Sequence, residues 1–188
     1  MIGLLFGSFN PIHLGHIALA TYLLEHGGLD EIWFVVSPHN PLKEEADLLP
    51  DELRLQLVNM AISDNPAFKA CDVEFEMAKP NYTLRTLEKL NELYPDKQFT
   101  LIIGADNLAC FTLWREYEKI LSTYPIVVYP REGVDLVPLK IQYPQVTVVE
   151  APLFPISSTE IRQLLKEKKD ASLWLHPLVN RYLLENSL

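Results

Sequence analysis

The chain has 188 residues, of which 48% are hydrophobic and 22% charged, and its formal net charge at pH 7 is -9. This size and composition fit one ordinary globular domain, and no apolar run reaches the roughly 18 residues that a membrane-spanning helix requires. At this negative charge we expect no nucleic-acid partner held by a general electrostatic field, and no membrane partner. If the ligand is an anion, its positive partner has to be local: a helix terminus, a few basic side chains or a metal ion.

Two features bear on the cellular compartment. The two cysteines, Cys71 and Cys110, belong to no CxxC motif and no Cys/His cluster, which is typical of reduced core thiols. The first residues, MIGLLFGS, contain neither the basic segment nor the small-residue cleavage site of a signal peptide. The sequence therefore predicts a cytoplasmic protein.

Strand-like and helix-like segments alternate along the chain. Apolar runs predict strands, and apolar residues at helical spacing predict helices. The Pro-containing stretches at 37–50 and 130–145 are predicted to be loops. In chain order, the predicted elements are a strand at 2–6, a helix at 16–26, a strand at 31–36, a helix at 50–63, a weaker strand at 69–75, a helix at 82–94, a strand at 99–104, a helical region at about 108–121, strands at 125–129 and 146–150, and helices near 158–168 and 176–185.

This alternation predicts an α/β fold, a Rossmann-like doubly wound parallel sheet with helices on both faces. We expect one domain over residues 1–188, in which about 155–188 form a small C-terminal helical cap. In such sheets ligands bind beyond the carboxyl ends of the strands, at the switch point. The segments expected to share that rim are 7–16, 37–43, 104–107, 129–133 and 154–162.

The segment GSFNPIHLGH, residues 7–16, follows the first predicted strand. His13 and His16 are three residues apart at a helix start, a spacing that turns both side chains to one side, and Gly15 lets a ligand approach the backbone. A helix start presents unpaired N–H groups and a partial positive charge, which favour phosphate. The alternatives are two incidental surface histidines, or a zinc site that lacks a nearby third ligand.

The pattern G-x-F-x-P-x-H-x-G-H in this segment resembles the signature of the nucleotidyltransferase superfamily, which transfers a nucleoside monophosphate from a triphosphate. Its members include the adenylyltransferases of NAD and coenzyme A synthesis. The resemblance implies that the turn after the strand, together with the histidines, contacts ATP. The residues concerned are Gly7, Ser8, Phe9, His13, Gly15 and His16.

The segment ISSTEIR, residues 156–162, precedes a late helix. Ser157 and Glu160 form a capping box, which explains both residues without any ligand. It does not explain Arg162, because a guanidinium near a helix N-terminus meets the positive end of the dipole. An anion held by Ser158 and Arg162 would explain why a guanidinium lies near the positive end of the helix dipole. The segment also matches the superfamily's I-S-S-T-x-x-R motif, and this implies that Ile156, Ser157, Ser158 and Arg162 contact ATP.

The whole chain resembles the nicotinate-nucleotide adenylyltransferases, and IIGADNLACFTLWREYEKIL is one of the segments that carry the resemblance. It implies that Gly104 and Asp106 lie at the nucleotide, where Asp106 accepts from ribose hydroxyls, and that Trp114 stacks on the pyridine ring. From the residues alone, a helix N-cap is as good a role for Asp106, and a core position on an amphipathic helix is as good for Trp114.

The segment NYTLRTL, residues 81–87, is a second pointer to this family. Tyr82 and Thr83 begin a helix, and in the family the amides there hold the carboxylate of nicotinate. A helix N-terminus favours a carboxylate over a neutral carboxamide, so the acid mononucleotide is the expected substrate.

Four substrate contacts in the loops are implied by the resemblance: Ser8, His39 and Lys43 in the first two loops and Arg131 after the fifth strand. The chain departs from the family near two of them. Asn40, not Lys, follows His39, and the loop after the fifth strand reads Arg-Glu-Gly instead of Arg-Pro-Gly.

The implied reaction is adenylyl transfer from ATP to nicotinate mononucleotide, which gives deamido-NAD and pyrophosphate. His13 and His16 are expected at the α-phosphate and Arg162 at the leaving pyrophosphate. Mg²⁺ is expected to arrive with ATP, because no carboxylate cluster in the sequence marks a protein-held metal. The sequence leaves open the amide mononucleotide or phosphopantetheine as acceptor, a non-catalytic nucleotide sensor on the same fold, and a homo-oligomer.

Overall fold

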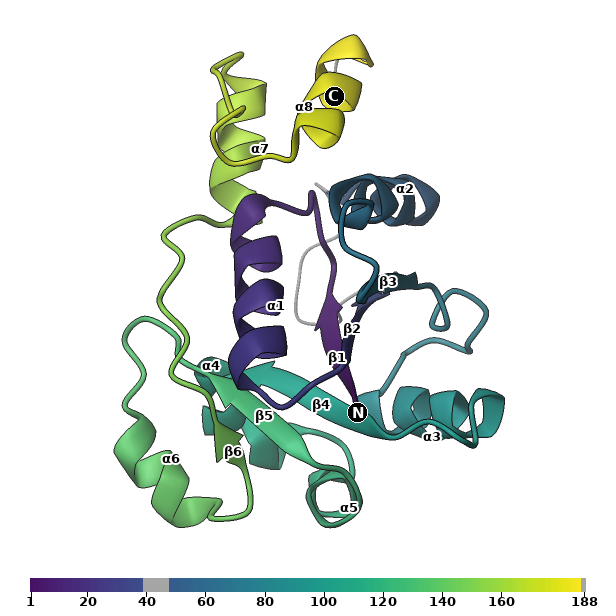
Figure 1. The fold of residues 1–188 in the computed structure, drawn as a ribbon, viewed down its shortest axis with the longest axis vertical. Helices are drawn as coiled ribbons and strands as arrows, with labels where there is room; N and C mark the ends of the chain where they lie inside the picture. The colour runs from purple at the N-terminus through teal and green to yellow at the C-terminus, as the bar shows by residue number, and fades with distance from the viewer. Residues whose placement is uncertain (39–47, 187–188) are drawn as a thin grey trace.

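The computed structural model describes residues 1–38 and 48–186, and within them six strands form one parallel sheet in the order β3-β2-β1-β4-β5-β6 (Figure 1). The predicted α/β class and doubly wound parallel sheet are confirmed. The strands are β1 (Ile2–Gly7), β2 (Glu31–Val36), β3 (Phe68–Cys71), β4 (Phe99–Gly104), β5 (Ile126–Tyr129) and β6 (Thr147–Val148).

Helices cover both faces of the sheet (Figure 1). None of those described has both the length and the apolar character needed to cross a membrane. The helices are α1 (Leu14–His26), α2 (Asp51–Ile62), α3 (Thr83–Leu93), α4 (Ala105–Ala109), the 3-10 helix η2 (Phe111–Leu113), α5 (Tyr117–Thr123), α6 (Leu136–Gln142), α7 (Ser158–Lys166) and α8 (Pro177–Glu185).

Alternate side chains of the central strands enter two separate hydrophobic cores. On β2, Phe34 belongs to the cluster that contains side chains of α1, α2 and α8, whereas Trp33 and Val35 belong to the cluster with α3 and α4. Successive strand residues point to opposite faces, so a strand covered on both faces needs an apolar residue at nearly every position. This explains the continuous apolar runs of β2 and β4.

The switch point of the sheet lies between β1 and β4. The chain moves outward from β1 through β2 to β3, then returns to pair β4 with the other edge of β1. In sheets of this kind, ligands bind at the switch point, beyond the carboxyl ends of the strands. Both segments that were expected to carry ligand contacts, 7–16 and 104–107, lie there.

The C-terminal helices pack on the α1–α2 side of the sheet. Figure 1 places the start of α7 beside the start of α1, and α8 contacts α2. The N–H of Leu14 donates to the carbonyl of Trp174 at 2.8 Å, which fastens the connection between α7 and α8 to the first residue of α1.

The stretch 130–145 was predicted to be a loop, and this is wrong because it contains α6. The Asp135 side chain caps the helix by accepting from the N–H of Val137 at 2.9 Å. Pro138 suggested a loop, but it occupies the first turn, where a helix needs no N–H donor from it.

Two other predicted boundaries are also wrong. The helical region at 108–121 is divided into α4, η2 and α5, because Trp114 is extended and Glu116 adopts a left-handed conformation with φ of 55°. The strand at 69–75 ends at Cys71, and a turn follows in which the N–H of Phe75 donates to the carbonyl of Asp72.

Candidate active site

The starts of α1 and α7 meet in space, although more than 140 residues separate them in the sequence. The Ser158 hydroxyl donates to the carbonyl of Pro11 at 3.0 Å, and Arg162 Nη1 donates to the carbonyl of Asn10 at 2.9 Å. A Cβ at Gly15 would lie 2.9 Å from Cγ2 of Ile156, so only glycine allows this approach. The two motifs thus form one site beyond the end of β1.

The two histidines stack on each other at this site. Their ring centroids are 3.7 Å apart at an interplanar angle of 29°. His13 is the residue before α1, and its N–H is directed at Nδ1 of His16 at 3.3 Å. Because Nδ1 of His16 accepts, the neutral ring carries its proton on Nε2. Nε2 is therefore the ring nitrogen of His16 that carries an N–H donor.

His13 is an uncharged imidazole at neutral pH. Its side chain is 6% exposed, and burial, assisted by the Arg131 guanidinium, lowers its pKa to about 4, against an opposing effect of Glu160. Its Nδ1 is buried without a hydrogen-bond partner in the described structure, which is compatible only with the neutral form.

Phe9 supports His16 from the turn after β1. Its ring is buried and meets the His16 ring edge-on, with centroids 5.1 Å apart, and it also packs against Phe34. Its backbone is left-handed, with φ of 45°, a strained conformation for a bulky residue. Gly7, the last residue of β1, and the partly buried Ser8 precede it.

The polar groups at the start of α7 have two roles: some cap the helix, and others contact the loop after β1. The capping box is present: the Glu160 carboxylate accepts from the N–H and hydroxyl of Ser157, whose Oγ accepts from the Glu160 N–H. The single hydroxyl proton of Ser158 is directed at Pro11. Arg162 directs two of its five N–H bonds at the Asn10 carbonyl and Oγ1 of Thr159.

The end of β4 places a carboxylate and a guanidinium at the other side of the switch point. Arg131 Nε lies 3.5 Å from Oδ1 of Asp106, and a Cβ at Gly104 would lie 2.3 Å from that same oxygen. The alternative role of Asp106 as an N-cap is wrong, because Gly104 occupies the N-cap of α4. The Asp106 carboxylate remains 47% exposed, so it is accessible to a ligand.

Tyr82 and Trp114 form a second group, at α3 and η2. Tyr82 is the N-cap residue of α3, whose first turn has no side-chain cap and no acidic residue. The guanidinium of Arg115 lies 4.9 Å from the centre of the Tyr82 ring, and that of Arg85 lies 5.9 Å from it. Trp114 is only partly buried and packs on Phe111, with ring centroids 5.2 Å apart. The start of α3, from Thr83 onward, is therefore a positively charged environment.

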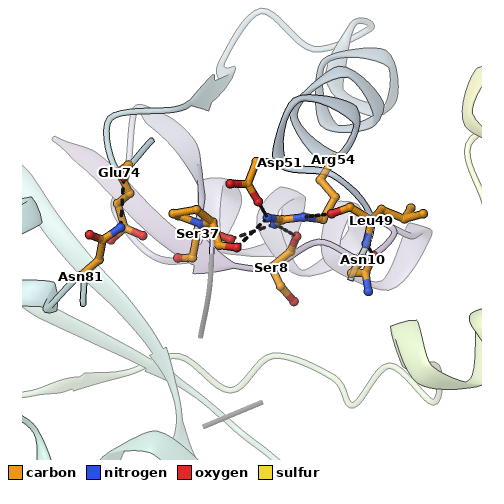
Figure 2. A network of polar contacts seen from close by, with 9 residues as sticks. Ser8, Asn10, Ser37, Leu49, Asp51, Arg54, Glu74 and Asn81 are labelled. Carbon is orange, nitrogen blue, oxygen red and sulfur yellow. Dashed lines mark hydrogen bonds and ion pairs between the residues drawn. The ribbon is translucent and has the colours of Figure 1, made fainter. Parts of the chain in front are cut away.

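Two buried charged residues near these loops were missed in the sequence (Figure 2). Arg54 is completely buried on α2, and Glu74 is 3% exposed in the turn after β3. The Glu74 carboxylate accepts from Oγ1 of Thr86 at 2.7 Å. Burial raises the pKa of Glu74, while hydrogen bonds with Thr86, Ser37 and Asn81 act in the opposite direction.

A signal for Arg54 exists in the sequence. It stands at the helical register of Leu57, Val58 and Ala61, which form the buried face of α2. His39 and Lys43 lie outside the described residues. Among the residues described, there is no group of three or more His, Cys, Asp or Glu side chains that could hold a metal ion.

Comparisons with known proteins show the family of this chain. A family model described as cytidylyltransferase-like matches residues 4–164. A probable nicotinate-nucleotide adenylyltransferase from Bacteroides fragilis is 50% identical over 185 residues, which are 98% of this chain and 92% of that protein. This chain belongs to the cytidylyltransferase-like family and, within it, to the nicotinate-nucleotide adenylyltransferases.

Two other relatives of this adenylyltransferase family extend the comparison. A probable nicotinate-nucleotide adenylyltransferase from Flavobacterium psychrophilum is 45% identical and covers 97% of this chain and 95% of its own length. The solved structure of Plasmodium falciparum nicotinic acid mononucleotide adenylyltransferase, complexed with NaAD, has the same fold. It covers 100% of this chain and 96% of its own with a TM-score of 0.82, at 22% identity.

The cytidylyltransferase-like match ends inside α7, two residues after Arg162. It therefore contains both motifs and leaves α8 outside, whereas the nicotinate-nucleotide adenylyltransferases match the chain nearly throughout.

Proposed function

We propose that this protein transfers the adenylyl group of ATP to nicotinate mononucleotide, forming deamido-NAD and pyrophosphate. The observation that carries the proposal is the meeting of the α1 and α7 starts through the Ser158–Pro11 and Arg162–Asn10 contacts. Two helix N-termini, two imidazoles and a guanidinium at one place form a site for several phosphate groups.

The chemistry requires alignment and neutralisation of charge more than proton transfer. The 5′-phosphate of the mononucleotide is already an anion, so it attacks the α-phosphorus of ATP in line without a general base, and pyrophosphate leaves. The protein contributes by holding the two substrates in line and by placing donors where negative charge develops.

The residues divide this work by position. Nε2–H of His16 donates to the α-phosphate, and the neutral His13, stacked against it, fixes the orientation of its ring. Arg162 binds the leaving pyrophosphate. The Ser158 hydroxyl donates its proton in a hydrogen bond to the Pro11 carbonyl, so it must rotate before it can donate to the same phosphates.

Mg²⁺ enters as part of the substrate, MgATP. Apart from the Glu160 carboxylate, which caps α7, the polar groups around the α1 and α7 starts are mainly donors and a guanidinium, which suit phosphate oxygens and not a dication. The ion adds charge neutralisation at the phosphates when it is bound.

The pyridine mononucleotide extends toward α3, η2 and β4. The amides of Tyr82 and Thr83, in a helix start flanked by Arg85 and Arg115, favour a carboxylate over a carboxamide. Trp114 stacks on the ring.

Further contacts come from the polar groups at the rim. Asp106 accepts from ribose hydroxyls and Arg131 approaches the substrate phosphate, with His39 and Lys43 as further contacts in the second loop. Both cysteines are free thiols, which suits the expected cytoplasmic location.

Pyrophosphate release with MgATP and a panel of acceptors, at matched concentrations, tests the proposal. We expect the largest kcat/KM with nicotinate mononucleotide. A larger value with nicotinamide mononucleotide or phosphopantetheine would reassign the acceptor, and no release with any acceptor would favour a nucleotide sensor.

A further inference from the structure

Arg54 joins the loops after β1 and β2 from a completely buried position on α2 (Figure 2). Its guanidinium contacts four backbone carbonyls and one carboxylate. The bonds are Nε to the Leu49 carbonyl at 3.0 Å, Nη1 to the Ser8 carbonyl at 2.5 Å and the Ser37 carbonyl at 2.8 Å, and Nη2 to the Pro38 carbonyl at 3.1 Å and Oδ1 of Asp51 at 2.5 Å.

These five bonds use all five N–H donors of the guanidinium. Among the described residues the carboxylate paired with this buried cation is that of Asp51, and a buried cation is costly unless every donor is paired, as every donor is here. Lysine has three donors and no planar fork, so it could keep the charge of Arg54 but not this set of bonds.

The bond to the Ser8 carbonyl determines where the next N–H points. In a trans peptide the C=O and N–H groups are antiparallel, so the Ser8–Phe9 peptide, with its oxygen on Arg54, directs the Phe9 N–H away from α2. The left-handed backbone of Phe9 needs such external restraint, because a bulky residue adopts it only where the surroundings fix it.

The same turn is fixed at its next residue by two other elements. Oδ1 of Asn10 accepts from the N–H of Leu49 at 3.0 Å, and Leu49 is itself bound to Arg54 through its carbonyl. The carbonyl of Asn10 accepts from Arg162 on α7. Arg54 and Arg162 therefore hold two peptides of one turn, Ser8–Phe9 and Asn10–Pro11, the first from α2 and the second from the phosphate site.

We propose that Arg54 is a positioning residue for adenylyl transfer: by holding the Ser8 and Ser37 carbonyls, it directs the Phe9 N–H toward the phosphates of ATP. The inference rests on the proposed function of the same site. Arg54 touches no substrate and acts only through the backbone of the first two loops.

Kinetics of Arg54→Lys provide the first test, with Leu57→Ala as the matched control. Leu57 is equally buried, one turn further along α2, and contributes packing only. We expect kcat of R54K to fall about 10²-fold, the scale of a misaligned reacting group, with KM for ATP raised. L57A should lose resistance to denaturant and, where it is folded, keep its kcat. A folded R54K with kcat within about threefold of wild type would overturn the proposal.

Chemical rescue of Arg54→Ala tests whether the planar set of N–H donors is needed or only the positive charge. Millimolar guanidinium should restore part of kcat because it supplies the same planar donors, whereas methylammonium should not. Recovery with both cations, or with neither in a folded variant, would contradict the proposal. If R54A does not fold, R54K decides the question.

The amide resonance of Phe9 gives a readout that does not depend on turnover. In the wild type, a non-hydrolysable ATP analogue should shift the Phe9 N–H signal, and in R54K that shift should disappear while the amide of Ser158 still responds. If R54K loses the Phe9 shift but the wild type releases no pyrophosphate with any acceptor, the proposed function is wrong and the positioning role of Arg54 stands. If the wild type and R54K release pyrophosphate at the same rate, the proposed function stands and the positioning role is wrong.

Discussion

The candidate site has two ends that are built differently. The phosphate end, formed by His13, His16, Ser158 and Arg162, is cross-linked by hydrogen bonds between distant segments and contains a buried imidazole. The ring end, formed by Tyr82, Trp114 and Arg115, consists of partly or fully exposed side chains held by ring contacts. Apart from the Ser158 hydroxyl, which has to rotate, the donors at the first end are held in place by these contacts, whereas the side chains at the second end can adjust.

Under the proposed function, this difference matches what each end has to do. Negative charge develops at the phosphates in the transition state, and fixed donors are most effective there because they need no reorganisation. The ring does not change during the reaction, so contacts to it are equally strong in the ground state and the transition state and affect KM more than kcat. Substitutions at the two ends should therefore separate kcat from KM.

The largest effect is expected at the phosphate end, from His16→Ala. We expect kcat to fall about 10²–10³-fold, the range for removal of one preorganised donor, with little change in KM for the mononucleotide. Steady-state pyrophosphate release measures both constants.

His26→Ala is the matched control for that variant. His26 is the last residue of the same helix, α1, and contacts Tyr22 instead of the site. H26A should keep wild-type kcat. If H16A lost less than about threefold, His16 would have no part in the chemistry and the contrast between the two ends would break down.

The burial of His13 makes stability depend on pH. Its pKa is about 4 in the folded protein and near 6.5 when unfolded, so between these values the unfolded state binds the extra proton. Stability is fully present above pH 6.5 and is lost as the pH falls toward 4, by at most about 3 kcal/mol.

Denaturant unfolding of the wild type and His13→Gln, from pH 7 to pH 4, measures how much His13 contributes to the pH dependence of stability. Glu74 is common to both proteins, so its opposite dependence cancels in their difference. The free energy of unfolding should fall less steeply in H13Q. Equal slopes would mean that His13 is accessible to protons in the folded state, and the phosphate end would then be less rigid than described.

The two ends also differ in how much the sequence reveals. The phosphate end lies in two contiguous motifs, 7–16 and 156–162, where residue spacing along a helix start already places His13 near His16 and Ser158 near Arg162. The alternating strands and helices similarly predict the sheet, because periodicity is a local property.

What the sequence did not reveal depends on partners far along the chain. The register of Arg54 on the apolar face of α2 indicates burial, but not that the carbonyls of Ser8 and Ser37 surround it. Glu74 continues the alternation of a strand in the sequence, and only the fold shows its side chain buried against Thr86. The α6 helix was missed for another reason, since Pro138 has opposite meanings in a loop and in a first turn.

Trp114→Ala sharpens the comparison from the ring end. Stacking of an aromatic side chain on a base contributes about 1–3 kcal/mol, so KM for nicotinate mononucleotide should rise roughly 5- to 150-fold. We expect kcat to stay within about twofold, because the contact does not change in the transition state.

Leu113→Ala is the neighbouring control, since Leu113 is 83% exposed and contributes little packing. It should leave both constants unchanged. A fall in kcat without a rise in KM in W114A would indicate that Trp114 orients the attacking phosphate, and the two ends would then not be separable.

The smallest effect is expected at Arg131, which lies between the two ends. Its contact with Asp106 is exposed, and such pairs contribute little, so Arg131→Gln should change the free energy of unfolding by no more than about 0.5 kcal/mol. The same guanidinium helps to lower the pKa of His13, however, so it acts on the phosphate end. We therefore expect a moderate loss of kcat/KM, about 3- to 10-fold, without a loss of stability.

Lys119→Gln removes another exposed pair, with Glu88, and should change neither quantity. If R131Q behaves like K119Q, the phosphate end does not extend beyond the starts of α1 and α7, and the ring end begins at Asp106.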